Sequence, residues 1–310
     1  MARVAVTGAT GFVGANLVRR LLDDGHEVHV LVRPDHHRWR LEDVADDLHW
    51  RIVDLGDRTE LGDLLHVMAP EQVFHLAAHG AYSWQTDEAA IFAANVVATD
   101  NLVAACRRAE VGALVHTGSS SEYGAVDHAP TEDEALRPNS YYALTKAWAG
   151  LAVQHAGYTT LRLYSVYGPW EDPRRLVATL VEHGLERRLP PLADPATARD
   201  FVHVDDVVDA LRAAAAQPTV AGGRVYNVGT GVQTTLRDAV AVARATFDLA
   251  AEPAWSTLAP RSWDTDVWVA DPRRIAAELG WRPATAFADG FARTVTWQRE
   301  RAARSEAVEP

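Results

Sequence analysis

Tyr142 and Lys146 lie four residues apart in the stretch NSYYALTKAWAG, a spacing that places them on one face of a helix, one turn from each other. A phenol has a reference pKa of about 10, so it works as a proton donor or acceptor at neutral pH only near a cation that favours the phenolate. Lys146 supplies that cation. The pair therefore indicates general acid–base chemistry, although the same spacing also occurs on ordinary solvated helices.

A glycine-rich turn near the N-terminus is the second chemical feature. In VTGATGFVG, Gly8, Gly11 and Gly14 stand between an apolar run and a helical pattern. Such a turn lets backbone N–H groups approach a pyrophosphate at the positive end of the helix. The alternative is a plain strand-to-helix turn.

Serine hydroxyls form the third feature, in ALVHTGSSSEYG, where an apolar strand runs into Ser119, Ser120 and Ser121. A hydroxyl at the carboxyl end of a strand can hydrogen-bond a substrate oxygen beside the tyrosine. A serine-rich loop that satisfies its own backbone is the alternative. The order of the features along the chain, glycine turn, serines, then tyrosine and lysine, favours the functional interpretation.

A parallel sheet is the scaffold that these residues require. Short apolar strands alternate with helical patterns over residues 14–24, 59–69, 89–109 and 139–155. This rhythm predicts an α/β fold with a doubly wound, Rossmann-type parallel sheet, whose ligands bind above the carboxyl ends of the strands.

The later part of the chain is irregular and rich in proline, which predicts a smaller, discontinuous lobe. We expect a dinucleotide-binding domain over residues 1–166 and 199–228, and a substrate-binding lobe over 167–198 and 229–300. The polar residues 301–310 are expected to form a frayed tail.

Composition excludes several classes of protein. The chain of 310 residues has a net charge of -12, which argues against a broad surface for nucleic acid or for an anionic membrane. The only cysteine, Cys106, allows no intrachain disulfide and is interpreted as a small core residue. No apolar run resembles a signal sequence or a membrane span, so we expect a soluble, cytoplasmic protein. His36 and His37 lack a third ligand at suitable spacing, so no metal site is predicted.

Beyond these features, the chain resembles the extended short-chain dehydrogenase/reductase family, whose members act on nucleotide-linked sugars. The resemblance covers nearly the whole length and is carried by the motifs TGATGFVG, VDL, HLAA, SSSEYG, the Tyr142–Lys146 pair, LRLYSVYGP, RDFVHVDDVVDA, NVGTG and APRSWDTDVWVADPRRIAAELGWRP.

The resemblance implies roles for individual residues. Tyr142 would be the acid/base, Lys146 would also bond the nicotinamide ribose, and Ser119 would be the catalytic serine. The dinucleotide would contact Gly8, Gly11, Phe12, Val13, Gly14, Asp54, Leu55, Leu76, Ala77 and Ala78. The substrate would contact Ser120, Ser165, Trp84, Arg199 and Arg261, the two arginines holding its diphosphate. Trp170, just after YGP, is also placed to meet a sugar.

Two departures from the family pattern affect the expected reaction. Dehydratases and decarboxylases of the family carry a glutamate where this chain has Ser121, and Glu122 is one residue late. Such a slip points a side chain to the opposite face of an extended segment, which disfavours elimination. After the second strand, Val32 and Arg33 replace the usual acid, so no carboxylate is expected to repel a 2′-phosphate, and Arg33 is predicted to bind it.

These residues lead to a first hypothesis, the NADPH-dependent reduction of a nucleotide-linked 4-keto-6-deoxy sugar, with NADP as cofactor and NAD as the alternative. An NAD-dependent nucleotide-sugar 4-epimerase is the second hypothesis. A non-catalytic dinucleotide-sensing protein is the third, which the intact serine, tyrosine and lysine set disfavours. By analogy with the family, a homodimer is expected through the helices around residues 89–109 and 139–155.

Overall fold

A seven-stranded, fully parallel sheet organises the computed structural model, which describes residues 1–258 and 266–308. The strands lie in the order β10-β6-β5-β4-β1-β2-β3. Their bounds are β1 Arg3–Thr7, β2 Glu27–Val32, β3 His49–Ile52, β4 Gln72–His75, β5 Ala113–Ser119, β6 Thr159–Leu163 and β10 Val225–Val228. The strand order reverses between β1 and β4, so the carboxyl edge there is the point where a doubly wound sheet binds its ligands. The predicted fold class is confirmed.

Helices cover both faces of this sheet, which explains why its strands read as nearly continuous apolar runs. On one face, α1 (Phe12–Asp23) and α7 (Val204–Ala216) share a core with β1 and β2. On the other, α2 (Arg58–Met68), α4 (Ala98–Arg108) and α5 (Tyr141–His155) pack together. Cys106 is fully buried in this second core, as predicted.

The single helix predicted over 89–109 is built from three consecutive pieces. They are α3 (Glu88–Phe92), the π-helical turn η2 (Ala93–Val97) and α4. By length and composition, Glu88–Arg108 could cross a membrane, but 56% of its apolar window is buried inside the protein. Since α4 packs between α2 and α5, its apolar residues are accounted for by the protein core.

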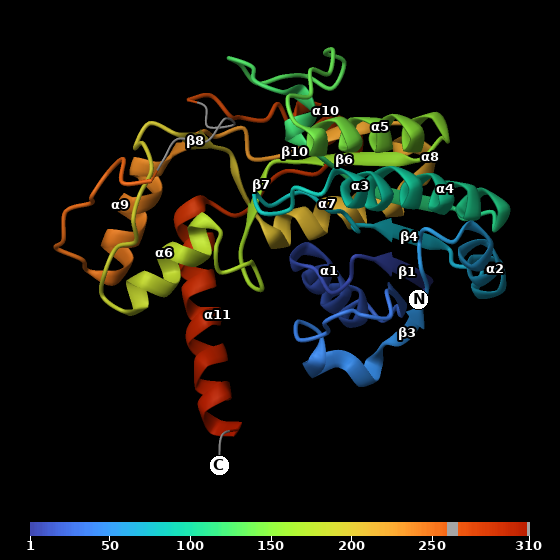
Figure 1. The fold of residues 1–310 in the computed structure, drawn as a ribbon, viewed down its shortest axis with the longest axis horizontal. Coiled ribbons are helices and arrows are strands. Elements are labelled where there is room, and N and C mark those ends of the chain that lie inside the picture. The colour runs from blue at the N-terminus through green and yellow to red at the C-terminus, as the bar shows by residue number, and fades with distance from the viewer. Residues whose placement is uncertain (259–265, 309–310) are drawn as a thin grey trace.

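A smaller lobe stands beside the sheet, at the left of Figure 1. It contains α6 (Leu176–Leu185), α9 (Leu236–Phe247) and α11 (Phe287–Val308), which share a core built around Leu180, Val240 and Phe291. Two small sheets, β8 (Ala198–Arg199) with β11 (Thr234–Thr235) and β7 (Ser165–Tyr167) with β9 (Phe201–His203), connect the lobe to the main sheet. The remaining short helices are η1 (Glu42–Asp47), η3 (Ser120–Tyr123), α8 (Pro218–Ala221) and α10 (Arg273–Leu279).

Two C-terminal segments differ from the expectation. Ile275 and Leu279 of α10 pack in the core of the main sheet, so we propose to assign α10 to the dinucleotide-binding unit instead of the lobe. In the segment expected to form the tail, residues 301–310, α11 continues to Val308. Its polar composition is compatible with a solvent-facing helix as well as with a tail.

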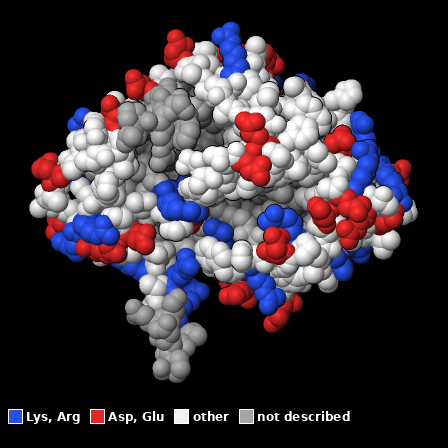
Figure 2. Space-filling model, in the orientation of Figure 1, with Lys and Arg blue, Asp and Glu red and all other residues white. Residues whose placement is uncertain are grey.

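Charges of both signs are interspersed over the face seen in Figure 2, which shows no broad basic surface. This distribution agrees with the net charge of -12.

Candidate functional site

The glycine turn after β1 has the shape that a pyrophosphate requires. Gly8 has φ +68°, and a Cβ on it would lie 2.5 Å from the backbone nitrogen of Ala77. A Cβ on Gly14 would lie 2.2 Å from the Gly8 carbonyl oxygen, whereas one on Gly11 would meet only a 3.1 Å contact. Helix α1 begins with neither a side-chain cap nor an acid in its first turn, so the N–H groups of Phe12 and Val13 are left for an anion. These residues fit the phosphates of a dinucleotide.

The other residues predicted to contact the dinucleotide lie along the same carboxyl edge of the sheet. Leu76, Ala77 and Ala78 follow β4, and the Ala77 N–H donates to the Thr7 hydroxyl at 3.3 Å. Beyond β3, Asp54 is exposed and Leu55 is half-buried.

At the end of β2, the structure places a carboxylate close to Arg33. Val32 is buried and the Arg33 side chain is 74% exposed, but Arg33 Nε lies 3.6 Å from a carboxylate oxygen of Asp35. A carboxylate therefore does stand near the position predicted for a 2′-phosphate. In the same segment, the Arg38 guanidinium lies 6.0 Å from the ring centre of Trp50.

Ser119, Tyr142 and Lys146 come together where β5 meets α5. Ser119 is the last residue of β5, and the other two lie on the first turns of α5. Burial raises the pKa of Tyr142 to about 12, opposed by a hydrogen bond from Ser119. Burial also lowers the pKa of Lys146 to about 8, opposed by the charge of Glu122. Two of the three side chains, Tyr142 and Lys146, thus have shifted pKa values, which is typical of sites of acid–base catalysis.

The turn after β5 decides which serine faces Tyr142. Ser119 caps η3, its Oγ accepting from the Ser121 N–H at 3.2 Å and lying 2.7 Å from the Ser121 hydroxyl. Ser120 is buried and, together with Tyr123, lines a small cavity. The geometry therefore favours Ser119 over Ser120 as the partner of Tyr142.

Glu122 is held beneath this turn by contacts to both of its carboxylate oxygens. It is fully buried, with one carboxylate oxygen 2.8 Å from Arg162 Nε and the other accepting from the Ser119 N–H at 2.7 Å. Burial raises the pKa of Glu122, and Arg162 opposes that shift. Since both oxygens are engaged, the only glutamate of SSSEYG has a structural role.

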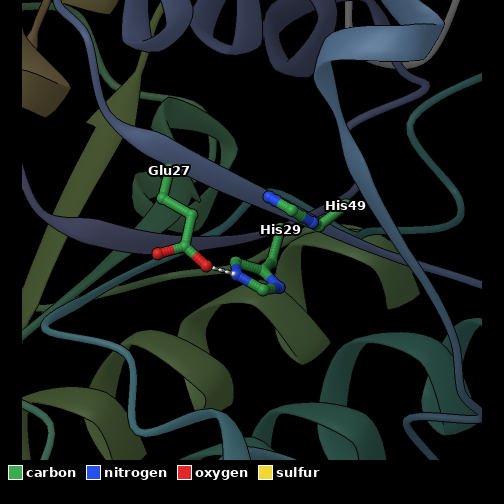
Figure 3. Close-up of side chains that lie close together, drawn as sticks. All are labelled: Glu27, His29 and His49. Carbon is green, nitrogen blue, oxygen red and sulfur yellow. Dashed lines mark hydrogen bonds and ion pairs between the residues drawn. The ribbon is translucent and has the colours of Figure 1, made fainter.

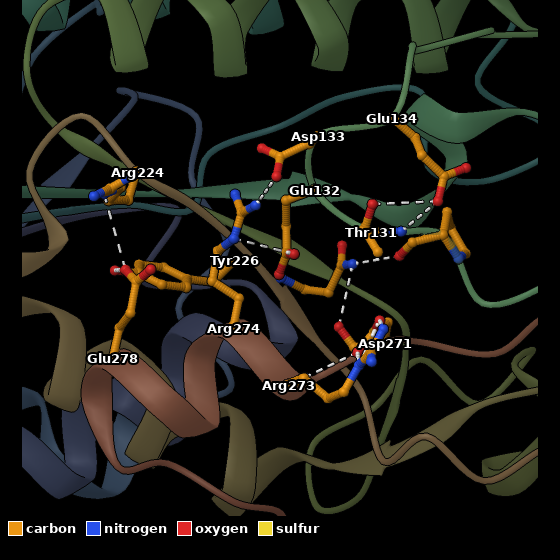
Figure 4. Close-up of polar contacts among 12 residues, drawn as sticks. Thr131, Glu132, Asp133, Glu134, Arg224, Tyr226, Asp271, Arg273, Arg274 and Glu278 are labelled. Atoms are coloured by element: carbon orange, nitrogen blue, oxygen red, sulfur yellow. Dashed lines mark hydrogen bonds and ion pairs between the residues drawn. The ribbon is translucent and has the colours of Figure 1, made fainter.

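A polar network continues from this turn to the opposite edge of the sheet. Arg162 donates to the Tyr123 hydroxyl at 2.8 Å, and Tyr123 donates to Asn227 Oδ1 at 2.8 Å. The Asn227 N–H in turn donates to Glu132, whose carboxylate lies 3.4 Å from Arg274 of α10. Figure 4 shows how the ion pair of Glu132 and Arg274 joins the loop between η3 and α5 to α10. The turn after β5 is thus anchored through side chains on η3, β6, β10 and α10.

The residues predicted to contact the substrate lie nearer the lobe. Ser165 is the half-buried first residue of β7. Arg199 lies on β8 with its guanidinium 5.4 Å from the ring centre of Trp268. Arg261 lies outside the described residues.

The two tryptophans singled out in the sequence have different surroundings. Trp84 is 47% exposed, stacks on Tyr82 at 4.6 Å and carries Arg174 over its ring at 3.6 Å. Trp170 packs between Arg19 of α1, at 4.3 Å, and Trp297 of α11, at 5.1 Å. Trp170 thus lies at a contact between the lobe and α1.

The sequence analysis did not identify several ionisable groups near Tyr142. Tyr82 and Arg175 both influence the pKa of Tyr142, the former raising it and the latter lowering it. Glu171, buried after β7, lies 3.6 Å from Arg175 and has a second carboxylate oxygen with no hydrogen bond among the described residues. The run WEDPRR directly after YGP could have indicated these residues, because charged residues that follow the carboxyl end of a strand so closely lie where this type of fold binds its ligands.

One cluster away from this site has metal-binding residue types but the wrong geometry. Figure 3 shows Glu27 and His29 of β2 beside His49 of β3. The two imidazole rings are stacked at 4.6 Å and 20°, so one ion cannot lie in the planes of both. His29 also already contacts Glu27 at 2.8 Å and Arg51 at 3.2 Å. We interpret the cluster as a polar network at the amino ends of the strands.

Comparisons with known proteins agree with this geometry. Residues 4–229 match the model of the NAD dependent epimerase/dehydratase family. A UDP-glucose 4-epimerase of Mycolicibacterium smegmatis is 36% identical over 96% of this chain and 99% of that protein. A dTDP-glucose 4,6-dehydratase of Streptomyces griseus is 31% identical over 98% and 96%.

The fold is also shared over its whole length with a solved structure. The UDP-glucose 4-epimerase of Thermotoga maritima, solved with UDP-glucose, matches with a TM-score of 0.88 and 26% identity, covering 97% of this chain and 99% of that one. With the glycine turn and the Ser119, Tyr142 and Lys146 site in place, the chain belongs to the NAD dependent epimerase/dehydratase family, in the extended short-chain dehydrogenase/reductase group of NAD-dependent enzymes.

Proposed function

We propose that this enzyme transfers a hydride reversibly at a hydroxyl-bearing carbon of a nucleotide-linked sugar, without eliminating water. The observation that carries the proposal is the arrangement of side chains where β5 meets α5. Ser119, Tyr142 and Lys146 lie there together, while both carboxylate oxygens of Glu122 are already bound, one by Arg162 and the other by the Ser119 N–H. A dehydratase needs an acid or base at the sugar skeleton, and Glu122 cannot serve there.

In the oxidation direction, Tyr142 takes the proton of the sugar hydroxyl as the hydride leaves the same carbon. In the reduction direction, Tyr142 returns that proton to the carbonyl oxygen. Ser119 orients the oxygen by hydrogen bonding, and the buried Lys146 ammonium stabilises the phenolate. A bound nicotinamide dinucleotide supplies the hydride carrier, with its phosphates at the Gly8–Gly14 turn.

For the net reaction, NAD-dependent 4-epimerisation is the better supported candidate. The Mycolicibacterium smegmatis relative, 36% identical over almost the full length, carries the name UDP-glucose 4-epimerase. The Asp35 carboxylate 3.6 Å from Arg33 also weakens the case for a 2′-phosphate. NADPH-dependent reduction of a 4-keto-6-deoxy sugar is the second candidate, favoured by Val32 and Arg33 in place of an acid.

One experiment separates these reactions. The purified protein is analysed for bound dinucleotide and then assayed with UDP- and dTDP-sugars, alone and with NADPH. An epimerase carries NAD through purification and interconverts two sugars with no net change at the absorbance band of reduced nicotinamide. A reductase consumes NADPH stoichiometrically with a 4-keto sugar, and Arg33→Ala erases its preference for NADPH over NADH.

The catalytic assignment has its own control. Tyr142→Phe removes one hydroxyl and should lower turnover by roughly two to four orders of magnitude while dinucleotide binding is retained. Near-normal turnover in that variant, or release of water from any substrate, would contradict the proposal.

We also propose that Arg199 and Arg261 hold the sugar's diphosphate and that the protein is cytoplasmic.

A further inference from the structure

Two buried histidines lie side by side behind the catalytic lysine. His75 of β4 and His116 of β5 are register partners on adjacent strands, and both are fully buried with ring centres 5.1 Å apart. Alternation along β5 puts His116 on the same face as Leu114, the face covered by α4 and α5. The pair therefore lies under the helix that carries Tyr142 and Lys146.

His75 is satisfied without the lysine. Its Nδ1 lies 2.7 Å from the Thr7 hydroxyl and its Nε2 lies 2.9 Å from the Thr99 hydroxyl. Burial lowers the pKa of His75 to about 3, with the charge of Lys146 acting in the same direction. His75 is thus a neutral ring fixed between two strands and α4.

His116, by contrast, contacts the lysine directly. Its Nε2 lies 3.3 Å from Lys146 Nζ, and the two residues are 0% and 1% exposed. An ammonium group can only donate, so Nε2 of His116 is the acceptor and the ring is neutral. Burial, together with the charge of Lys146, holds the pKa of His116 well below its ordinary value. The ring therefore accepts a hydrogen bond but does not relay a proton.

The other groups facing Lys146 do not replace this contact. Glu122 of η3 attracts the ammonium through its charge, but its oxygens are occupied by Arg162 and the Ser119 N–H. His75 of β4 is satisfied by its two threonines, and Tyr142 lies one turn away on the same helix. His116 alone offers Nζ an acceptor among the hydrogen bonds of the described residues.

We propose that His116 is a positioning residue for Lys146, whose neutral imidazole fixes Nζ in place and keeps the buried ammonium protonated near neutral pH. Only the catalytic consequence rests on the proposed hydride-transfer function. Without His116, the buried ammonium would lose the acceptor that Nζ has among the described residues, which favours the neutral amine.

The sequence offers a direct way to observe this lysine, because Lys146 is the only lysine among the 310 residues. Protein labelled with lysine carrying ¹³C at Cε gives one side-chain signal, and its chemical shift reports the protonation of Nζ. The titration is recorded for wild type, His116→Gln and His116→Leu. Glutamine places an amide oxygen near the former Nε2, whereas leucine has no acceptor. His29→Leu, which removes a buried histidine far from the site, is the control for lost stability.

In the wild type the signal should titrate near the pKa of about 8 set by burial. His116→Leu should lower the midpoint by about one pH unit, while His116→Gln and His29→Leu stay within a few tenths of wild type. An unchanged midpoint in His116→Leu would overturn the proposal. A drop in His116→Gln as large as in His116→Leu would also overturn it, because ring packing would then be the cause.

This readout requires no substrate, so the role of His116 is tested even if the proposed sugar reaction fails. If hydride transfer is also observed, the alkaline limb of the rate profile should move to lower pH in His116→Leu and stay in place in His116→Gln. Tyr142→Phe would abolish that rate while leaving the lysine signal visible, which separates the two proposals.

Discussion

Ser119 performs two tasks, because the hydroxyl that meets Tyr142 also caps the short helix η3. Ser119→Ala should therefore reduce turnover and also lower the free energy of unfolding by about 1 kcal/mol, the usual cost of a lost cap. Ser119→Thr keeps the hydroxyl and should retain most of the turnover and most of the free energy of unfolding. Steady-state kinetics and urea unfolding measure the two effects separately. If Ser120→Ala proves the more damaging change, Ser120 is the catalytic serine.

Glu171 makes the stability of the protein depend on pH. Burial raises its pKa from 4.5 to about 8, so between these values the folded chain retains a proton that the unfolded chain has released. Stability from this group is therefore greatest at acidic pH and falls as pH rises to about 8. Glu171→Gln should flatten that part of the unfolding free energy profile, and the exposed Glu182→Gln should not. Parallel profiles for wild type and Glu171→Gln would contradict the assignment.

At the scale of elements, the turn between β1 and α1 depends most on Gly14. Gly14→Ala places a methyl group 2.2 Å from the Gly8 carbonyl oxygen, so α1 must shift away from β1. We expect a lower melting temperature and lost dinucleotide binding in calorimetry. Gly11→Ala meets only a 3.1 Å contact and is the matched control, expected to be milder in both measurements. Equal effects of the two substitutions would contradict the interpretation that close packing at Gly14 is what the turn requires.

The elements that carry the candidate site were predictable because local signals define them. The strand ending at Ser119 and the helix bearing Tyr142 and Lys146 appear in the sequence as an apolar run and a 3.6-residue pattern. The role of His116 could not be predicted in this way. Its partner is 30 residues away, and their contact depends on how α5 lies across β5. Likewise, the sequence after β2 did not reveal that Asp35 would turn back toward Arg33.

For the whole molecule, the exposed side of α5 and the neighbouring helix supports the predicted homodimer. Leu144, Trp148 and Leu151 on α5 are 53%, 41% and 55% exposed, and Phe92 and Val97 nearby are 45% and 37% exposed. Large apolar side chains gathered on adjacent helices are typical of an interface. We therefore expect a dimer in sedimentation equilibrium, formed through this surface.

A charge on this surface should dissociate the dimer. Leu151→Arg should give a monomer, whereas Val67→Arg, at an 83% exposed site on α2, should leave the dimer intact. A monomeric wild type, or a dimer that survives Leu151→Arg with Trp148→Glu, would rule out this interface.

The solitary lysine has a practical consequence for handling the enzyme. Since Lys146 is 1% exposed, amine-reactive reagents in solution cannot reach the one lysine of the 310 residues, whereas Met1 is fully exposed. Met1 precedes the first residue of β1, and in a parallel sheet the amino ends of the strands lie opposite the carboxyl edge that forms the site. When these 310 residues are produced on their own, coupling to an amine-reactive sensor chip would therefore attach each molecule at Met1, with the carboxyl edge of the sheet turned toward the flowing solution.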